Sequence, residues 1–239
     1  MARACLVNPL TAVFAFLVLW CGGAPAPAAA ETFRIFMLGD SVTAGYGVEA
    51  GKSLPDQLQA ALNARGHGVR VINGGVSGDT SAGGRARMGW SLKAKPHAVV
   101  VGLGGNDALR GIDPAATRAN LDAILTRLDQ AGLPVLLAGW KAPRNLGPEY
   151  VRDFEAVFPA LARKHGVLFY PFILDGVALK PDLNQGDGIH PNAQGVARMV
   201  KGMLPLVERL IASIGKAPEN SGHPRMPRGP GGGPGGGQP

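Results

Sequence analysis

The sequence predicts an α/β fold, a three-layer α/β/α sandwich built around a five-stranded parallel sheet. Between Thr32 and Gly215, short apolar runs alternate five times with amphipathic segments, which is typical of parallel strands covered by helices on both faces. The 239-residue chain is 46% hydrophobic, which suits one domain with a sizeable core. Because crossovers between parallel strands are right-handed, few topologies remain, and we expect the strand order 2-1-3-4-5.

The five expected strands are short runs rich in β-branched and other apolar residues. The third run contains three consecutive valines, which is typical of a strand buried on both faces. The predicted strands cover 33–38, 69–73, 97–103, 134–140 and 167–172.

The five expected helices are recognised by the spacing of their apolar residues and by signals at their ends. The clearest follows Asp113 as N-cap, has Pro114 at its first position and stops at Gly132. The segment that Thr80 caps is less regular, because three glycines lower its helix propensity. The predicted helices cover about 54–65, 80–93, 113–132, 148–165 and 192–214.

Both ends of the chain differ in composition from its middle. Residues 1–30 contain one charge, Arg3, then an apolar run and the small residues Ala28-Ala29-Ala30, which is the pattern of a secretory signal peptide. The apolar run is shorter than the ~20 residues that a membrane span needs, so we expect no stable span. We predict a signal peptide at 1–30, a folded domain at 31–215 and a disordered Gly/Pro-rich tail at 216–239, in a periplasmic or secreted protein.

Cysteine usage and charge narrow the chemistry further. The two cysteines, Cys5 and Cys21, lie in the predicted signal, so the mature protein would have no disulfide, thiol nucleophile or cysteine metal site. Trp20 precedes Cys21 where a lipid-modified cysteine normally follows small residues, which favours ordinary cleavage. Of the 24 basic and 17 acidic residues, 20 and 16 fall within 31–215, a net charge of +4 without a basic cluster. We therefore expect no nucleic-acid partner.

A phosphate-binding loop is the first alternative that the motifs raise. Gly51-Lys52-Ser53 matches the end of such a loop, but the glycine required five positions before Gly51 is replaced by Tyr46. We expect instead that Ser53 caps the next helix and that Lys52 is solvated. The segment 102–107 is a broken dinucleotide fingerprint, because Asp107 stands where the third glycine belongs.

A second set of residues predicts nucleophilic catalysis. Ligands bind at the carboxyl ends of parallel strands, so the loops that follow the strands converge at one edge. Ser41 follows the first strand, and His190 follows Asp187 by three residues before the last helix. A serine nucleophile, a histidine base and a carboxylate that orients the base are the parts that acyl transfer requires. Oxyanion donors would be the backbone N–H groups of Ser41 and Gly78 and the side-chain amide of Asn106.

Four segments of the chain resemble the signature blocks of the SGNH, or GDSL, hydrolases. They read "LGDSVTAGY", "SGDTS", "LGGNDALRG" and "DGIHPN", in matching order and spacing over most of 33–214. The resemblance implies a flavodoxin-like SGNH hydrolase fold, with Ser41 as nucleophile and Asp187 and His190 completing the triad. It further implies Gly78 and Asn106 as oxyanion donors, and neither a metal nor a cofactor. Within the family, the chain looks most like the bacterial thioesterase I, lysophospholipase L1 and arylesterase branch.

The expected function is therefore that of a serine esterase acting as a monomer on small-molecule or lipid esters or thioesters. An acetyl-sugar esterase of the same fold is one alternative, and a non-catalytic ligand-binding module is another. The loop after the fourth strand contains Lys141 and Arg144, where the resembling branch has an apolar loop, so no preference for acyl-chain length is carried over. Asp40, Asp79 and Asp107 are expected to order their loops through hydrogen bonds.

Overall fold

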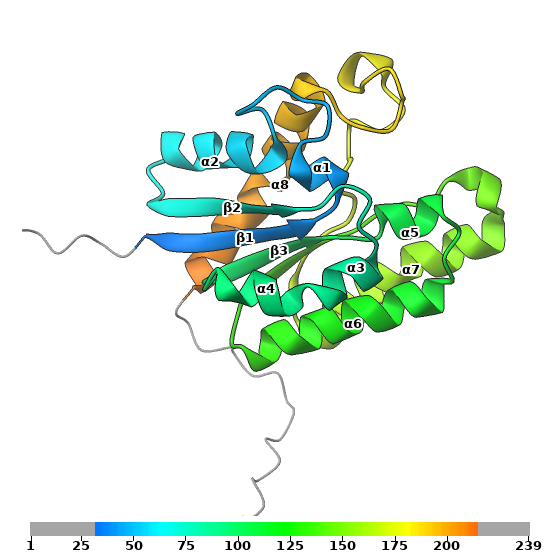
Figure 1. Ribbon diagram of the computed structural model, residues 1–239, viewed down its shortest axis with the longest axis horizontal. Coiled ribbons are helices and arrows are strands. Elements are labelled where there is room, and N and C mark those ends of the chain that lie inside the picture. Colours follow the sequence, from blue (N-terminus) through cyan, green and yellow to red (C-terminus); the bar gives the residue numbers. More distant parts are fainter. Residues whose placement is uncertain (1–31, 215–239) are drawn as a thin grey trace, which may run out of the picture. The chain divides into compact units, whose positions relative to one another are not determined.

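A computed structural model describes residues 32–214, and its centre is a five-stranded parallel sheet (Figure 1). The strand order is β2-β1-β3-β4-β5, so the predicted topology is confirmed. The predicted signal peptide at 1–30 and the predicted tail at 216–239 lie outside the described residues. The strands are β1 (Phe33–Gly39), β2 (Val69–Gly75), β3 (Ala98–Gly102), β4 (Val135–Ala138) and β5 (Leu168–Tyr170).

Helices cover both faces of the sheet, as the alternating pattern predicts. Helix α2 packs against α8 on one face, and α6 packs against α3 and α7 on the other (Figure 1). Two 3-10 turns, η1 (Arg144–Leu146) and η2 (Pro181–Leu183), lie in the loops after β4 and β5. The helices are α1 (Ser41–Ala44), α2 (Leu54–Ala64), α3 (Ser81–Ala86), α4 (Met88–Lys93), α5 (Gly105–Leu109), α6 (Pro114–Gln130), α7 (Pro148–His165) and α8 (Ala193–Ser213).

The helix expected over 80–93 is wrong in one respect, because it is two helices that meet at Arg87. Arg87 has ψ near 10°, which turns the chain between α3 and α4. Its guanidinium points inward, where it donates to Asp79 and to the carbonyl of Gly39. Gly84 lies so close to Leu103 that a Cβ there would collide with the leucine side chain. Gly84, one of the glycines that weaken this helix, therefore lets α3 approach the end of β3.

The short helices α1 and α5 were not expected, because four or five residues are too few to show helical periodicity. Both begin directly beyond the carboxyl ends of central strands: α1 after β1 and α5 after β3. All residues of β3 and β4 are buried, so the sheet centre is a rigid platform for these helices. Within the described residues, none of the helices has the length and apolar character needed to cross a membrane.

The segment between β5 and α8 is held against the start of α8. Asn192, the N-cap of α8, accepts from the backbone N–H groups of Gln194 and Gly195 and donates to the carbonyls of Asp182 and Asn184. An antiparallel bridge joins Asn184 to Pro191, which closes the loop that contains Asp187 and His190. This closure fixes the position of that loop relative to the sheet.

Gly195 is the closest point of this packing, and a substitution there tests it. An added Cβ would lie 3.1 Å from Pro191 Cβ and closer still to the carbonyl oxygen of Leu183. We expect Gly195→Ala to push the loop from α8 and to lower the free energy of unfolding by about 1–3 kcal/mol. Urea denaturation measures the change, and Gly89→Ala in α4 is the control. Nothing lies within 4 Å of a Cβ at Gly89, so that variant should be neutral or slightly more stable. Equal stability of the two variants would contradict the prediction.

Candidate active site

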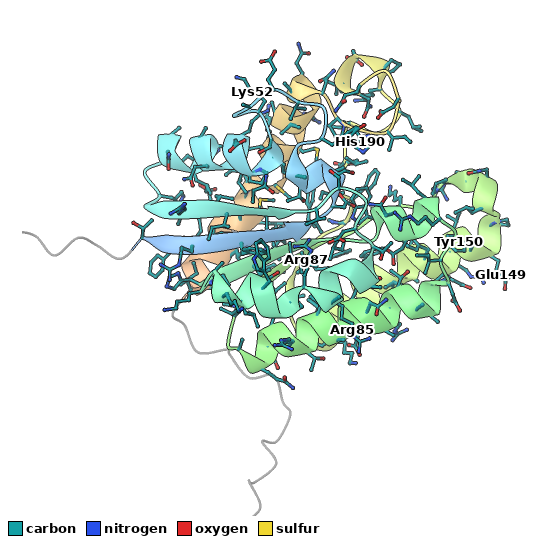
Figure 2. All side chains as sticks on the ribbon, in the orientation of Figure 1. Lys52, Arg85, Arg87, Glu149, Tyr150 and His190 are labelled. Carbon is teal, nitrogen blue, oxygen red and sulfur yellow. The ribbon has the colours of Figure 1, made fainter. Side chains whose placement is uncertain are left out.

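Ser41 and His190 meet at the carboxyl edge of the sheet, although 149 positions separate them. Ser41 is the first residue of α1, directly after β1, and its side chain is buried. Its Oγ lies 2.9 Å from Nε2 of His190. Figure 2 shows His190 where the loop after β5 comes beside α1. The structure thus brings together the predicted nucleophile and its predicted base.

Asp187 holds the imidazole from the opposite side. Its Oδ2 lies 2.6 Å from Nδ1 of His190, while its Oδ1 accepts from the backbone N–H groups of Ile189 and His190 at 2.9 and 3.0 Å. Gly188 has φ of 70°, a value that lets the short turn close. The hydrogen bond from the His190 backbone, followed by those from its side chain and from Ile189, lowers the pKa of Asp187 to about 2. An ionised carboxylate accepts from Nδ1–H, which leaves Nε2 as an acceptor toward Ser41.

The three predicted oxyanion donors come from loops that are linked to one another. Asn106, in α5, donates through Nδ2 to the carbonyl of Asp79 at 3.0 Å, and the amide has a second N–H on the same nitrogen. Gly78 has φ of 85°, and its carbonyl accepts from Arg110 Nη2 at 2.9 Å. Two side chains of one short helix region therefore hold the loop after β2.

Arg87 joins this loop to the strand that leads into Ser41. Its Nε donates to Asp79 Oδ2 at 2.5 Å and its Nη2 to the carbonyl of Gly39 at 2.8 Å. The Val76 N–H also donates to the carbonyl of Gly39, at 3.1 Å. The role of Arg87 could not be predicted from the sequence, since nothing in its local pattern distinguishes it from a solvated arginine on a weak helix. This linking role depends on the break between α3 and α4, which brings the Arg87 guanidinium to the end of β1.

Residues 37–198 match the GDSL-like lipase/acylhydrolase family. The chain belongs to this family. The predicted family and the predicted class of ester hydrolase are both confirmed.

Relatives of this hydrolase share its fold as well as its sequence. Esterase TesA of Pseudomonas aeruginosa is 38% identical over 185 residues, which are 77% of this chain and 91% of that protein. Thioesterase 1/protease 1/lysophospholipase L1 of Escherichia coli K12 is 40% identical over 199 residues, 81% and 92% of the two chains. The crystal structure of AlinE4, an SGNH-hydrolase family esterase, superimposes with a TM-score of 0.65 at 44% identity and covers 76% of this chain and 98% of that one.

The nucleotide-binding alternative finds no support in the geometry of this hydrolase. Lys52 is exposed, and Ser53 caps α2 by accepting from the Asp56 N–H at 3.4 Å while its Oγ donates to the Asp56 carboxylate at 2.5 Å. Both expectations for this segment are confirmed. Within residues 32–214, no group of three or more His, Cys, Asp and Glu side chains is arranged to hold a metal ion.

Buried carboxylates order the loops around Ser41, as expected. Asp40 is only 1% exposed, and its Oδ1 caps α1 by accepting from the Val42 N–H at 3.0 Å. Burial raises the pKa of Asp40 to about 7, an effect that the hydrogen bond from Val42 opposes and the neighbouring Asp107 and Asp79 reinforce. Asp107 accepts from Ser81 N at 2.8 Å and Oγ at 2.5 Å, which ties α5 to α3.

The pKa of Asp40 gives a prediction for stability against pH. Below about pH 3.8 the carboxyl is protonated in both the folded and the unfolded chain. As pH rises toward 7, the unfolded chain loses this proton first, so the side chain destabilises the fold by an amount that levels off above pH 7, at most roughly 4 kcal/mol. Asp40→Asn places an amide that does not titrate at this position, and its oxygen can still accept from the Val42 N–H.

We expect the free energy of unfolding of Asp40→Asn, relative to the wild type, to increase between pH 4 and pH 7. Urea titrations at four pH values across this interval measure it. The control is Asp129→Asn on the exposed side of α6, whose difference from the wild type should change little. A pH-independent difference for Asp40→Asn would show that this carboxyl is ionised throughout.

Proposed function

We propose that this hydrolase cleaves carboxylic esters through an acyl-enzyme on Ser41, with His190 as base and Asp187 as the group that orients it. The observation that carries the proposal is the unbroken chain of contacts, 2.9 Å from Ser41 Oγ to Nε2 and 2.6 Å from Nδ1 to Asp187. A hydroxyl that donates to a neutral imidazole is the arrangement required for attack on a carbonyl.

The reaction runs in two halves. Ser41 Oγ attacks the carbonyl carbon while its proton passes to Nε2 of His190, and the negative charge collects on the carbonyl oxygen. The N–H groups of Ser41 and Gly78 and the amide of Asn106 are the proposed donors to that oxygen. His190 then gives its proton to the departing alcohol or thiol. Water, deprotonated by His190, attacks the acyl-enzyme, and the acid leaves as Ser41 regains its proton.

The proposed substrates are small-molecule or lipid esters and thioesters. Relatives named esterase, thioesterase/lysophospholipase and arylesterase, the last from Vibrio mimicus at 37% identity, support this range. An acetyl-sugar esterase is a second candidate, favoured by a relative named acetylxylan esterase at 28% identity, of whose length the match covers 44%. We further propose that residues 1–30 direct export, so that the enzyme works as a periplasmic or secreted monomer without a cofactor.

The nucleophile can be tested with nitrophenyl esters from acetate to decanoate. We expect Ser41→Ala and His190→Ala to lower kcat by several orders of magnitude, roughly 10⁴- to 10⁶-fold, because each removes a member of a unit that acts together. A fluorophosphonate probe should label the wild type at Ser41 and leave Ser41→Ala unlabelled. The control is Lys52→Ala, an exposed site that should keep full activity. Wild-type activity in Ser41→Ala would end the proposal.

The oxyanion role of Asn106 is tested separately. We expect Asn106→Ala to lower kcat about 10²- to 10³-fold with a small change in KM, because the donor acts on charge that develops only in the transition state. Arg110→Ala is the matched control, since it removes a hydrogen bond to the same loop but no proposed donor. If the two variants lose kcat equally, Asn106 acts by positioning the loop and is not a donor.

A further inference from the structure

Tyr46 lies against the imidazole of His190 and takes no part in the mechanism above. The centroids of the two rings are 4.7 Å apart, and their planes are tilted by 43°. Tyr46 is nevertheless 54% exposed, so about half of the side chain is open to solvent beside the proposed base. In the sequence this residue breaks the phosphate-loop pattern and ends the first signature block, and neither observation gives its side chain a role.

The backbone of Tyr46 is anchored to both partners of the catalytic contact. Its N–H donates to the carbonyl of Ser41 at 3.0 Å, and its own carbonyl accepts from Gln185 Nε2 at 2.7 Å. Gln185 in turn donates through its backbone N–H to the carbonyl of His190 at 2.8 Å. A chain of three hydrogen bonds therefore runs from Ser41 to His190, and the contact between their side chains closes it into a ring of four.

Two glycines allow the ring of Tyr46 to take this place. Gly45 and Gly47 have φ of 85° and 69°, the left-handed region that residues with a Cβ rarely adopt. A Cβ on Gly47 would also collide with the side-chain amide of Gln185, the group that holds the Tyr46 carbonyl. The backbone of this turn therefore fixes where the Tyr46 ring lies.

The Tyr46 ring lies on the side of the site where the leaving group of the ester is expected. His190 must deliver its proton to the departing atom, so that atom has to come within hydrogen-bonding reach of Nε2. The proposed oxyanion donors Gly78 and Asn106 belong to other segments, the loop after β2 and the helix α5 after β3. A group attached to the departing atom therefore lies beside the imidazole, where the exposed part of the Tyr46 ring offers an aromatic surface.

Exposed apolar side chains are frequent in the segments that follow the carboxyl ends of the strands. Seven large hydrophobic side chains in the described part of the chain are exposed, and five of them lie in segments that follow the strands at the catalytic edge: Tyr46, Val76, Leu109, Leu179 and Ile189. Ile189 is the neighbour of His190 in the chain. Tyr46, whose ring contacts the imidazole, and Ile189 are therefore the exposed apolar residues that the structure ties most directly to His190.

We propose that Tyr46 is a specificity-determining residue that binds aromatic leaving groups beside His190 and so favours aryl over alkyl esters. The inference rests on the proposed serine mechanism and adds to it a preference on the alcohol side of the ester. Tilted or offset aromatic pairs favour association by about two- to ten-fold, which sets the size of the effect.

Two acetate esters with different alcohols, phenyl acetate and trifluoroethyl acetate, test the proposal. Their acyl groups are identical, so the ratio of their kcat/KM values isolates the alcohol side. We expect Tyr46→Ala to lower this ratio about two- to ten-fold, mainly through KM for phenyl acetate, and Tyr46→Phe to keep the wild-type ratio. Tyr46→Leu retains apolar bulk without an aromatic face, so its ratio of kcat/KM values should be lowered as much as that of Tyr46→Ala. It replaces Tyr46→Ala in the test if the alanine variant is unstable.

The control variant is Trp90→Ala, which removes an aromatic side chain that is 59% exposed on α4, outside the loops of the site. Its ratio should equal that of the wild type. An equal loss of kcat/KM on both esters in Tyr46→Ala and Tyr46→Leu would overturn the proposal and leave Tyr46 as a support for His190. An active Ser41→Ala would instead overturn the serine mechanism itself.

Discussion

The hydrogen bond between Ser41 and His190 is the constraint on which the rest of the site depends. It joins residues from the two ends of the folded domain, so it exists only if the first and last parts of the chain meet at one edge of the sheet. Parallel strands provide this, because all their carboxyl ends point the same way. The packing of α8 against the loop after β5 then sets the distance, through Asn192 and the close approach at Gly195.

Acidic side chains lie around Ser41, where the proposed mechanism would develop a negative charge on the substrate carbonyl oxygen. Asp79 and Asp107 lie close enough to Asp40 to raise the pKa of its carboxyl, in addition to the larger effect of burial. Each carboxylate is occupied: Asp79 pairs with Arg87, Asp107 accepts from Ser81, and Asp40 caps α1. Burial also keeps Asp40 largely protonated up to about pH 7. Asp40 can therefore cap α1 while it adds little negative charge beside Ser41 below about pH 7.

The strands, the long helices and their order could be predicted because each leaves a periodic or apolar pattern of its own. The caps at Ser53 and Asp113 could be placed because they follow local rules of side-chain hydrogen bonding. The short helices α1 and α5 and the break at Arg87 could not, since they are too short for periodicity and depend on contacts with the ends of β1 and β3. These unpredicted elements are the ones that surround Ser41.

The sequence by itself determined the fold class, the strand order, the family and the residues that form the candidate triad, because motif spacing and hydrophobic pattern are properties of the linear chain. Only the tertiary structure decided what stands beside those residues. Arg87 links the loop of Gly78 to the end of β1, and the Tyr46 ring lies on His190, both through contacts between distant segments. Such contacts depend on the path of the folded backbone, including the positive φ values at Gly45 and Gly47. No pattern of neighbouring residues specifies that path.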